Sequence, residues 1–184
     1  MTSSDIMNAQ QLWELIETAR RQVPDPSDGR AVAARAVTLL STRPGGEIVA
    51  ADQVLHGLIA DSYRKPLWAA AYVINGGCSD DGFDYFRGWL IVQGREVYER
   101  IVADPDTLAD LPVIGTRPPG AWPVECEDTL YIASRAYRAA TGEELPHRAV
   151  TIRYPQLDPA WGFDFDDRAE MTRRLPRLAA LFLG

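Results

Sequence analysis

PLWAAAYVINGGCSDDGFDYFRGWLIVQGREVYERI, residues 66–101, decides the fold, because it predicts two buried helices joined by a short turn. Pro66 begins the first helix, since proline is favoured at the first helical position, where its missing N–H loses no hydrogen bond. The segment Leu67–Ile74 carries no charge, which is typical of a buried helix. Asn75–Gly77 ends this helix because glycine readily adopts the left-handed conformation of a helix end. Ser79 is then expected to cap the second helix.

The second helix is predicted to run without interruption from Asp80 to Ile101. Asp80 and Asp81 lie in its first turn, where negative charge interacts favourably with the helix dipole. At about 100° per residue, its large apolar side chains form one stripe. Gly94 leaves a gap in that stripe, which predicts that the backbone of a neighbouring helix lies against it. The stripe consists of Phe83, Phe86, Leu90, Val97 and Ile101.

Polar side chains lie beside this stripe on a helix that is otherwise largely apolar. Asp80, Asp84 and Arg87 share one face, and Gln93 lies at the edge of the stripe. Burying an unpaired polar group costs about 1–3 kcal/mol, so these groups need partners. We therefore expect Asp84 and Arg87 to be paired and at least half buried, next to the loop at residues 75–79.

The rest of the chain also predicts helices, so the fold class is mainly α. A single-domain bundle of about six helices is expected over residues 8–184, after a flexible start at residues 1–7. Asn8 and Gln11 resemble a capping box at the start of the first helix. Helices outside the central hairpin are predicted at about 8–23, 28–40, 47–63, 124–141 and 167–183, the last interrupted at Pro176.

Two segments lack a helical pattern. Residues 112–123 contain four prolines and two glycines, which predicts an irregular loop. Such a long loop is either a surface connector or a functional segment. Residues 149–154 alternate as Val150, Ile152 and Tyr154, which is the one strand-like run. The bundle is therefore expected to contain at most a minor strand element.

Composition limits the classes of function. Of the 184 residues, 46% are hydrophobic, which suffices for a normal core, and the net charge is −7. An acidic chain is not expected to bind nucleic acid, which requires a surplus of basic residues. No apolar run approaches the roughly 20 residues of a membrane span, and no signal peptide is recognised. Two distant cysteines, Cys78 and Cys126, fit free thiols in a reducing compartment, so a cytoplasmic location is expected.

No familiar catalytic motif is present. The sequence lacks a glycine-rich phosphate loop, a nucleophile elbow and a two-histidine zinc helix. Acidic clusters recur instead, and Asp80 and Asp84 are spaced to hold a hard cation such as magnesium. Each cluster also begins a predicted helix, where acids stabilise the dipole without any metal. We adopt the second interpretation and expect neither a metal nor a cofactor.

The central stretch resembles a bacterial family known as domain of unknown function 4240. The residues that carry the resemblance are Asn75–Gly77, Ser79–Asp81, Phe83, Phe86–Arg87, Trp89–Leu90 and Gln93–Gly94. Further similarities are Trp13 with Ile16, Leu67–Ala70, Asp104–Pro105 with Leu108, Glu127, Trp161, and Leu175–Leu178. The family also occurs fused to WGR modules in proteins labelled regulators of molybdate metabolism. This sequence has no WGR module, and the resemblance implies no reaction, cofactor or catalytic residue.

Two classes of function remain open on the sequence. The first, which we favour, is a binding or regulatory module that recognises a protein or peptide partner. The alternative is an enzyme that tailors a peptide or small metabolite, with Asp80, Asp84 and Arg87 as its acid–base groups or metal ligands. The sequence specifies no oligomeric state. The candidate binding residues are Asp80, Asp81, Asp84, Arg87, Gln93 and Glu127.

Overall fold

The computed structural model of the chain describes residues 7–118, 121–146 and 153–184. These residues form ten α-helices and three short 3₁₀ helices and no strand, which confirms the mainly α class. The expected number of about six helices is wrong, because several predicted helices are divided. The elements are α1 (Ala9–Arg21), α2 (Gly29–Leu40), α3 (Gly45–Asp61), α4 (Lys65–Asn75), α5 (Asp80–Val92), α6 (Arg95–Ala103), η1 (Pro105–Asp110), α7 (Pro112–Gly115), η2 (Glu127–Tyr131), α8 (Ile132–Thr141), η3 (Pro159–Trp161), α9 (Arg168–Arg174) and α10 (Pro176–Phe182).

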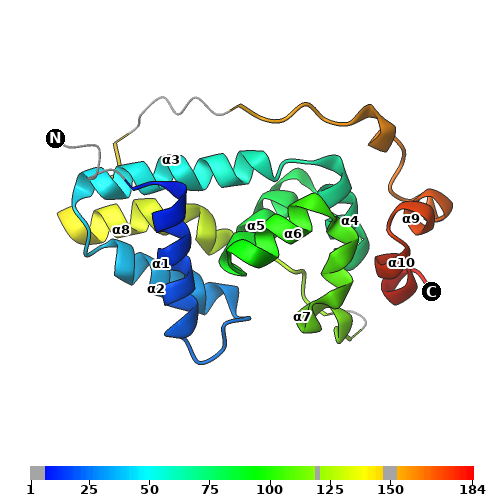
Figure 1. Cartoon of the computed structure of the whole chain (residues 1–184), viewed down its shortest axis with the longest axis horizontal. Coiled ribbons are helices and arrows are strands. Elements are labelled where there is room, and N and C mark those ends of the chain that lie inside the picture. The colour runs from blue at the N-terminus through cyan, green and yellow to red at the C-terminus, as the bar shows by residue number, and fades with distance from the viewer. Residues whose placement is uncertain (1–6, 119–120, 147–152) are drawn as a thin grey trace.

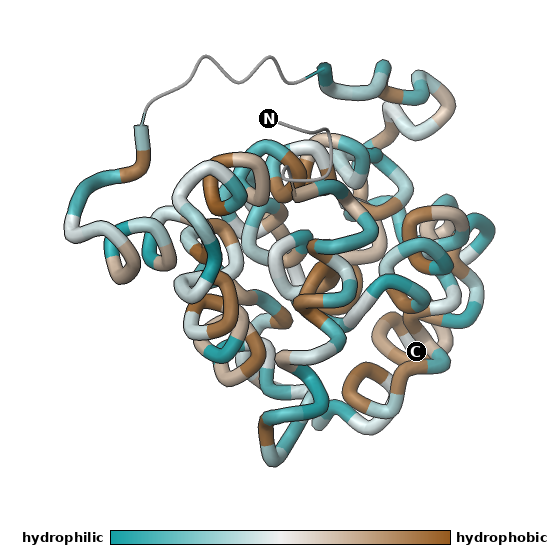
Figure 2. The backbone as a smooth tube through the Cα atoms, turned by 60° about the vertical axis from the view of Figure 1, so that its left-hand side comes forward, coloured by the Kyte–Doolittle hydropathy of each residue, from teal (hydrophilic) through white to brown (hydrophobic). Residues whose placement is uncertain are grey.

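The helices gather at two ends of an elongated molecule (Figure 1). At one end α1, α2, α3 and α8 pack against one another, and at the other end α4 and η1 contact α10. α5 lies between them, because it contacts α2 and α3 on one side and α4 and α6 on the other. Hydrophobic positions recur along the central helices, as the tube in Figure 2 shows, and the buried ones form one continuous core. α5 is thus the central element of the fold.

Capping residues in the sequence predicted several helix ends correctly. The capping box is present, since the Asn8 side chain accepts from the Gln11 backbone N–H and the Gln11 side chain accepts from that of Asn8. Gly76 ends α4 in the left-handed conformation at φ +67°. The Ser79 hydroxyl accepts a hydrogen bond from the backbone N–H of Gly82 at the start of α5. The turn of the central hairpin therefore forms as its residues predict.

Gly94 does not lie inside a helix, contrary to the predicted uninterrupted second helix. Its φ of +96° ends α5 and begins α6, a conformation that side-chain-bearing residues rarely adopt. The predicted contact with a neighbouring helix backbone is also wrong, since a β-carbon here would meet the Glu17 carboxylate of α1. The glycine is present because the chain turns there.

Three other predicted elements differ from the structure. The helix expected from Val124 begins as the 3₁₀ helix η2 and becomes α-helical only at Ile132. The expected loop at 112–123 contains the short helix α7 in its described part. Of the strand-like run at 149–154, residues 149–152 lie outside the described residues, and Arg153 and Tyr154 belong to no strand. The last predicted helix is divided at Pro176 as expected, into α9 and α10.

The helices are short relative to a lipid bilayer. No helix among the described residues combines the length and the apolar character that crossing a membrane requires.

Candidate functional site

The turn between α4 and α5 fixes the start of α5, where the predicted site residues lie. The Trp68 indole N–H of α4 donates to the Cys78 carbonyl at 2.9 Å. The ring of Trp68 stacks on that of Phe83 in α5, with centroids 4.9 Å apart. A hydrogen bond and an aromatic contact therefore hold the two helices in one orientation. This arrangement places Asp80, Asp81 and Asp84 along the first turns of α5.

Arg87 lies in the interior behind these acids. It is 1% exposed, and its guanidinium donates to the Asp84 carboxylate, the Ile59 carbonyl and the Phe83 carbonyl, the last at 3.3 Å. Burial lowers the pKa of Arg87, whereas the charge of Asp84 raises it. The Asp84 side chain is 47% exposed, so the predicted pairing and half-burial are confirmed. One charged side chain thereby joins α5 to the end of α3.

Aromatic rings enclose the Arg87 guanidinium. Its central carbon lies 4.6 Å from the centroid of the Phe83 ring and 5.0 Å from that of Tyr63. Tyr154, from the C-terminal region, packs edge-on against Tyr63 with centroids 5.2 Å apart. Cation–π contacts of this kind strengthen when the cation is removed from water. Arg87 is therefore held by hydrogen bonds and ring faces and is not open to solvent.

Negative charge gathers on the outer side of α5. Asp80, Asp81 and Glu127 are exposed, and the pKa of the partly exposed Tyr85 is raised, chiefly by the charge of Glu127. Partial burial and the charges of Asp81 and Asp84 raise this pKa further. The charges of Asp81, Asp84 and Glu127 thus all act on one phenol, and Glu127, although distant in sequence, comes close to α5 because η2 packs on that helix.

The remaining predicted residues lie apart from this cluster. Gln93 is 7% exposed at the opposite end of α5, where its amide donates to the Trp89 carbonyl at 3.4 Å. Asp80 is two residues from Cys78, whose pKa is raised to about 11, chiefly by burial and further by the charges of Glu125 and Asp80. The predicted binding residues therefore divide into an exposed acidic group, a buried arginine and a distant buried amide.

Asn75 and Gly88 hold the segment before η2 against α5, a role that was not predicted from the sequence. The Asn75 side chain accepts from the Val124 N–H at 2.8 Å and donates to the Val124 carbonyl at 3.4 Å. A β-carbon on Gly88 would lie 2.5 Å from the Cys126 carbonyl oxygen, so only glycine lets this segment pack on α5. Together they bring Glu127 next to Tyr85. The sequence offered one signal, a glycine in the middle of a buried helix.

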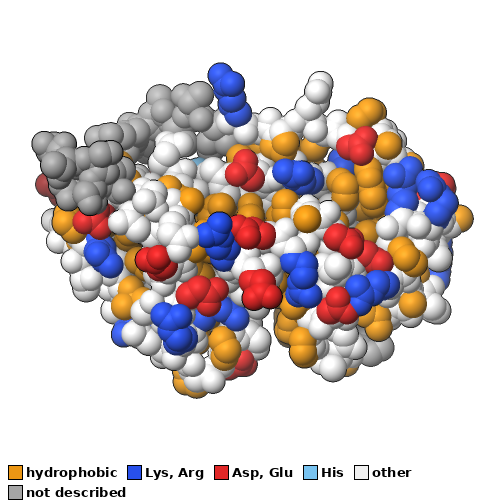
Figure 3. Space-filling view, viewed as in Figure 1, with side chains coloured by type: hydrophobic (Ala, Val, Ile, Leu, Met, Phe, Trp, Pro, Cys, Tyr) orange, Lys and Arg blue, Asp and Glu red, His pale blue; other side chains and the backbone are white. Residues whose placement is uncertain are grey.

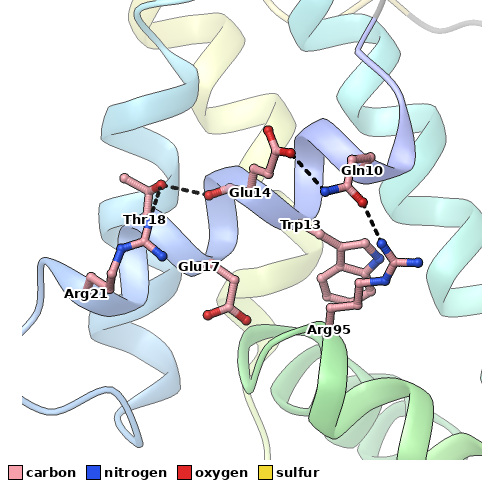
Figure 4. A pocket seen from close by; sticks show the side chains of 7 residues that line it. All are labelled: Gln10, Trp13, Glu14, Glu17, Thr18, Arg21 and Arg95. Atoms are coloured by element: carbon pink, nitrogen blue, oxygen red, sulfur yellow. Dashed lines mark hydrogen bonds between the residues drawn. The ribbon is translucent and has the colours of Figure 1, made fainter.

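A second feature is the open groove between α1 and the start of α6 (Figure 4). Its polar side chains bond mainly to one another: Gln10 donates to Glu14 at 2.8 Å and accepts from Arg95 at 2.5 Å. Acidic and basic side chains alternate across this face of the molecule (Figure 3). The groove therefore carries both positive and negative side chains and has no predominant charge. It is lined by Gln10, Trp13, Glu14, Glu17, Thr18, Arg21 and Arg95.

The described residues contain no group of three or more His, Cys, Asp or Glu side chains placed to hold a metal ion. His56 bonds to its own helix instead, with Nδ1 2.9 Å from the Asp52 carbonyl oxygen. The exposed acids Asp80, Asp81 and Glu127 most directly support the attraction of a cation, because several carboxylates lie together on an exposed surface.

The comparisons with known proteins place this site inside a family match. The family model described as "Protein of unknown function (DUF4240)" matches residues 7–139, from the start of α1 into α8. The match includes α5 and η2, which carry the acidic side chains of Asp80, Asp81, Asp84 and Glu127. Neither a curated protein nor a solved structure matches the chain.

Proposed function

The chain belongs to the DUF4240 family of proteins of unknown function, and we propose that it is a binding or regulatory module that recognises a basic segment of a protein or peptide partner. The surface that makes the contact is the outer side of α5 and the adjoining η2, which we call the acidic face. Its residues are Asp80, Asp81, Asp84, Tyr85, Glu127 and Tyr131.

The observation that carries this proposal is the packing of η2 on α5, in which the Cys126 N–H donates to the Tyr85 carbonyl at 2.9 Å and brings Glu127 alongside the acids of α5. Within the described part of the chain, Asp84 is ion-paired to Arg87, whereas Asp81 and Glu127 have no basic partner. Carboxylates that are not neutralised attract Lys and Arg side chains and steer a basic partner toward the surface. Tyr85 and Tyr131 add aromatic area of the kind that is enriched at interfaces.

The burial of Arg87 supports recognition over catalysis. A guanidinium that is 1% exposed and bonded to two buried carbonyl oxygens and one half-exposed carboxylate has no free edge for a substrate. In this proposal Arg87 acts through Asp84, whose carboxylate it holds in place at the surface. Gln93, at the other end of α5, takes no part in the acidic face.

We propose that the module acts in the cytoplasm. Cys78 and Cys126 are free thiols, and their survival as thiols suits a reducing compartment.

Affinity capture from an extract of the native host tests the acidic face. The immobilised chain is compared with Asp81→Asn/Glu127→Gln, which removes two charges from this face, and with Glu143→Gln/Glu144→Gln, which removes two exposed charges elsewhere. Proteins recognised through the acidic face should remain on the wild-type chain and the control, and should be lost from the first variant. Equal retention by all three chains, at equal melting temperatures, would show that this face does not recognise a partner.

A further inference from the structure

Trp122 is the most exposed large hydrophobic side chain in the described part of the protein. It is 90% exposed, whereas Tyr154, Leu181 and Tyr131 are between 44% and 55% exposed. A tryptophan buries about 150–250 Å² when it packs, so leaving one in water forfeits a large hydrophobic gain. An indole in this state is suited to insertion into another surface.

The backbone around Trp122 is held on both sides. The Arg117 guanidinium donates to the carbonyl of Trp122 itself. Two residues later, the Asn75 side chain forms its two hydrogen bonds with the backbone of Val124. The indole therefore projects from an anchored stretch of chain.

An apolar groove adjoins this stretch between the end of α4 and α10. Its volume is about 390 Å³, and Arg117 and Asn75 form part of its lining. Leu181 on its α10 wall is 46% exposed, which leaves apolar surface open to solvent. The apolar side chains of the groove are Val73, Ile74, Pro118, Ala121, Leu181 and Phe182.

We propose that this groove binds Trp122 of a second copy of the chain. The groove lies beside the stretch of backbone that carries the indole, because Arg117 lines the groove and donates to the Trp122 carbonyl, and Ala121, the residue before Trp122, is also part of the lining. A surface that carries both a projecting group and its receptor is self-complementary. Two copies related by a two-fold axis then exchange their tryptophans, and the contact closes as a dimer without forming a filament.

The size of the contact sets its strength. Two inserted indoles and an equal area of groove wall bury roughly 600–1,000 Å² in total, at about 150–250 Å² for each ring. Stable interfaces bury about 1,200 Å² or more, and smaller ones belong to weak complexes. The dimer is therefore weak and reversible, and forms at high protein concentration.

Sedimentation velocity of the full chain over roughly a hundredfold range of concentration tests the association. The mean mass of the wild-type chain should rise from 20.4 kDa toward twice that value. Trp122→Ala and Leu181→Glu should each remain at the monomer mass, and Trp122→Ala should also keep the wild-type melting temperature, because the Trp122 side chain is 90% exposed. Tyr154→Ala, which removes an exposed aromatic ring elsewhere, should associate like the wild type. A wild-type chain that stays monomeric, or a Trp122→Ala chain that associates normally, would overturn the proposal.

Photo-cross-linking locates the contact. The chain is prepared with p-benzoylphenylalanine in place of Trp122, an aromatic group that the groove can hold, and is irradiated at high concentration. A covalent dimer cross-linked to peptides from α4 or α10 is expected. An adduct within the same chain would show that the ring fills its own groove, and a dimer cross-linked elsewhere would place the interface on another surface. Either result rejects the proposed exchange.

Discussion

Position 88 accepts only glycine, because a β-carbon there would clash with the Cys126 carbonyl oxygen. Helix propensity alone would favour alanine at this position by about 1 kcal/mol. The new methyl group of Gly88→Ala would lie 2.5 Å from the Cys126 carbonyl oxygen and 3.3 Å from the Thr129 β-carbon. We expect overpacking to destabilise the fold by about 1–3 kcal/mol, measured by urea unfolding.

Gly57→Ala on α3 is the matched control for this substitution. A β-carbon at Gly57 meets no atom within 4 Å, so the helix should gain about 0.5–1 kcal/mol. Opposite signs for the two variants are expected. A stabilised Gly88→Ala variant would contradict the close approach of η2 to α5.

Arg87 should contribute more to stability than any exposed arginine. Arg87→Ala leaves the Ile59 carbonyl and the half-buried Asp84 without their partner, so we expect a loss of about 3–5 kcal/mol in the free energy of unfolding. Arg173→Ala, whose side chain is 63% exposed and paired with Glu170, should cost at most about 1 kcal/mol. Chemical denaturation of the two variants measures both values. Similar losses would argue against the buried role of Arg87.

Part of this residue network was predictable from the sequence. Asp84 and Arg87 lie three residues apart on one helix, and that spacing alone brings their side chains together. The other groups around the guanidinium, Ile59 and Tyr63, come from α3 and the loop that follows it. No local pattern links them to Arg87, because their contact depends on how the helices pack.

At the level of elements, α3 carries a pair that should make stability depend on pH. The pKa of His56 is raised, chiefly by its hydrogen bond with the Asp52 side chain and against the effect of partial burial. A raised pKa in the folded state means that the protonated ring stabilises the fold. This contribution is complete below the unfolded pKa of about 6.5 and is lost as the pH rises through the higher folded value.

Asp52→Asn should therefore reduce stability more at pH 5.5 than at pH 8. The measurement is the free energy of unfolding of both chains at the two pH values. Asp61→Asn, on the same helix, is a matched control that removes one carboxylate without touching His56, and it should show no such difference. A larger loss of stability for Asp52→Asn at pH 8 than at pH 5.5 would show that the His56–Asp52 pair does not cause the pH dependence.

Element boundaries were predictable where the signal was local and failed where it was distant. Asn8, Gly76 and Ser79 each act within a few residues, so the ends they set were predicted correctly. The extended stretch before η2 could not be foreseen, because it depends on Asn75, 49 residues away from Val124. The break at Gly94 was missed because its apolar flanks continue a helical stripe.

On the scale of the whole molecule, Asp106 ties the C-terminal region to the body. Its carboxylate accepts hydrogen bonds from the backbone N–H groups of Leu178 at 3.0 Å and Arg177 at 3.1 Å, at the start of α10. This is an N-terminal cap supplied by a different element, η1. The C-terminal region lies beyond the family match, which ends at residue 139.

Asp106→Ala should destabilise the chain by about 0.5–2 kcal/mol, the usual cost of losing such a cap. We also expect α10 to become sensitive to protease before the remaining helices do. Asp110→Ala, which removes an exposed partner of Arg177, should cost at most about 1 kcal/mol and leave the protease pattern unchanged. Identical digestion of both variants would show that the cap does not hold α10 in place.

The buried position of Cys126 makes its thiol a probe of how often the native fold opens. The thiol is 2% exposed where α2 and α5 meet, and burial raises its pKa. A thiol-specific reagent can modify it only while that junction is transiently open, since the reactive species is the solvated thiolate. The rate of modification of the native chain therefore reports how often α5 separates from its neighbours. Cys78, whose pKa is raised to about 11, should react slowly as well, and peptide mapping distinguishes the two labels.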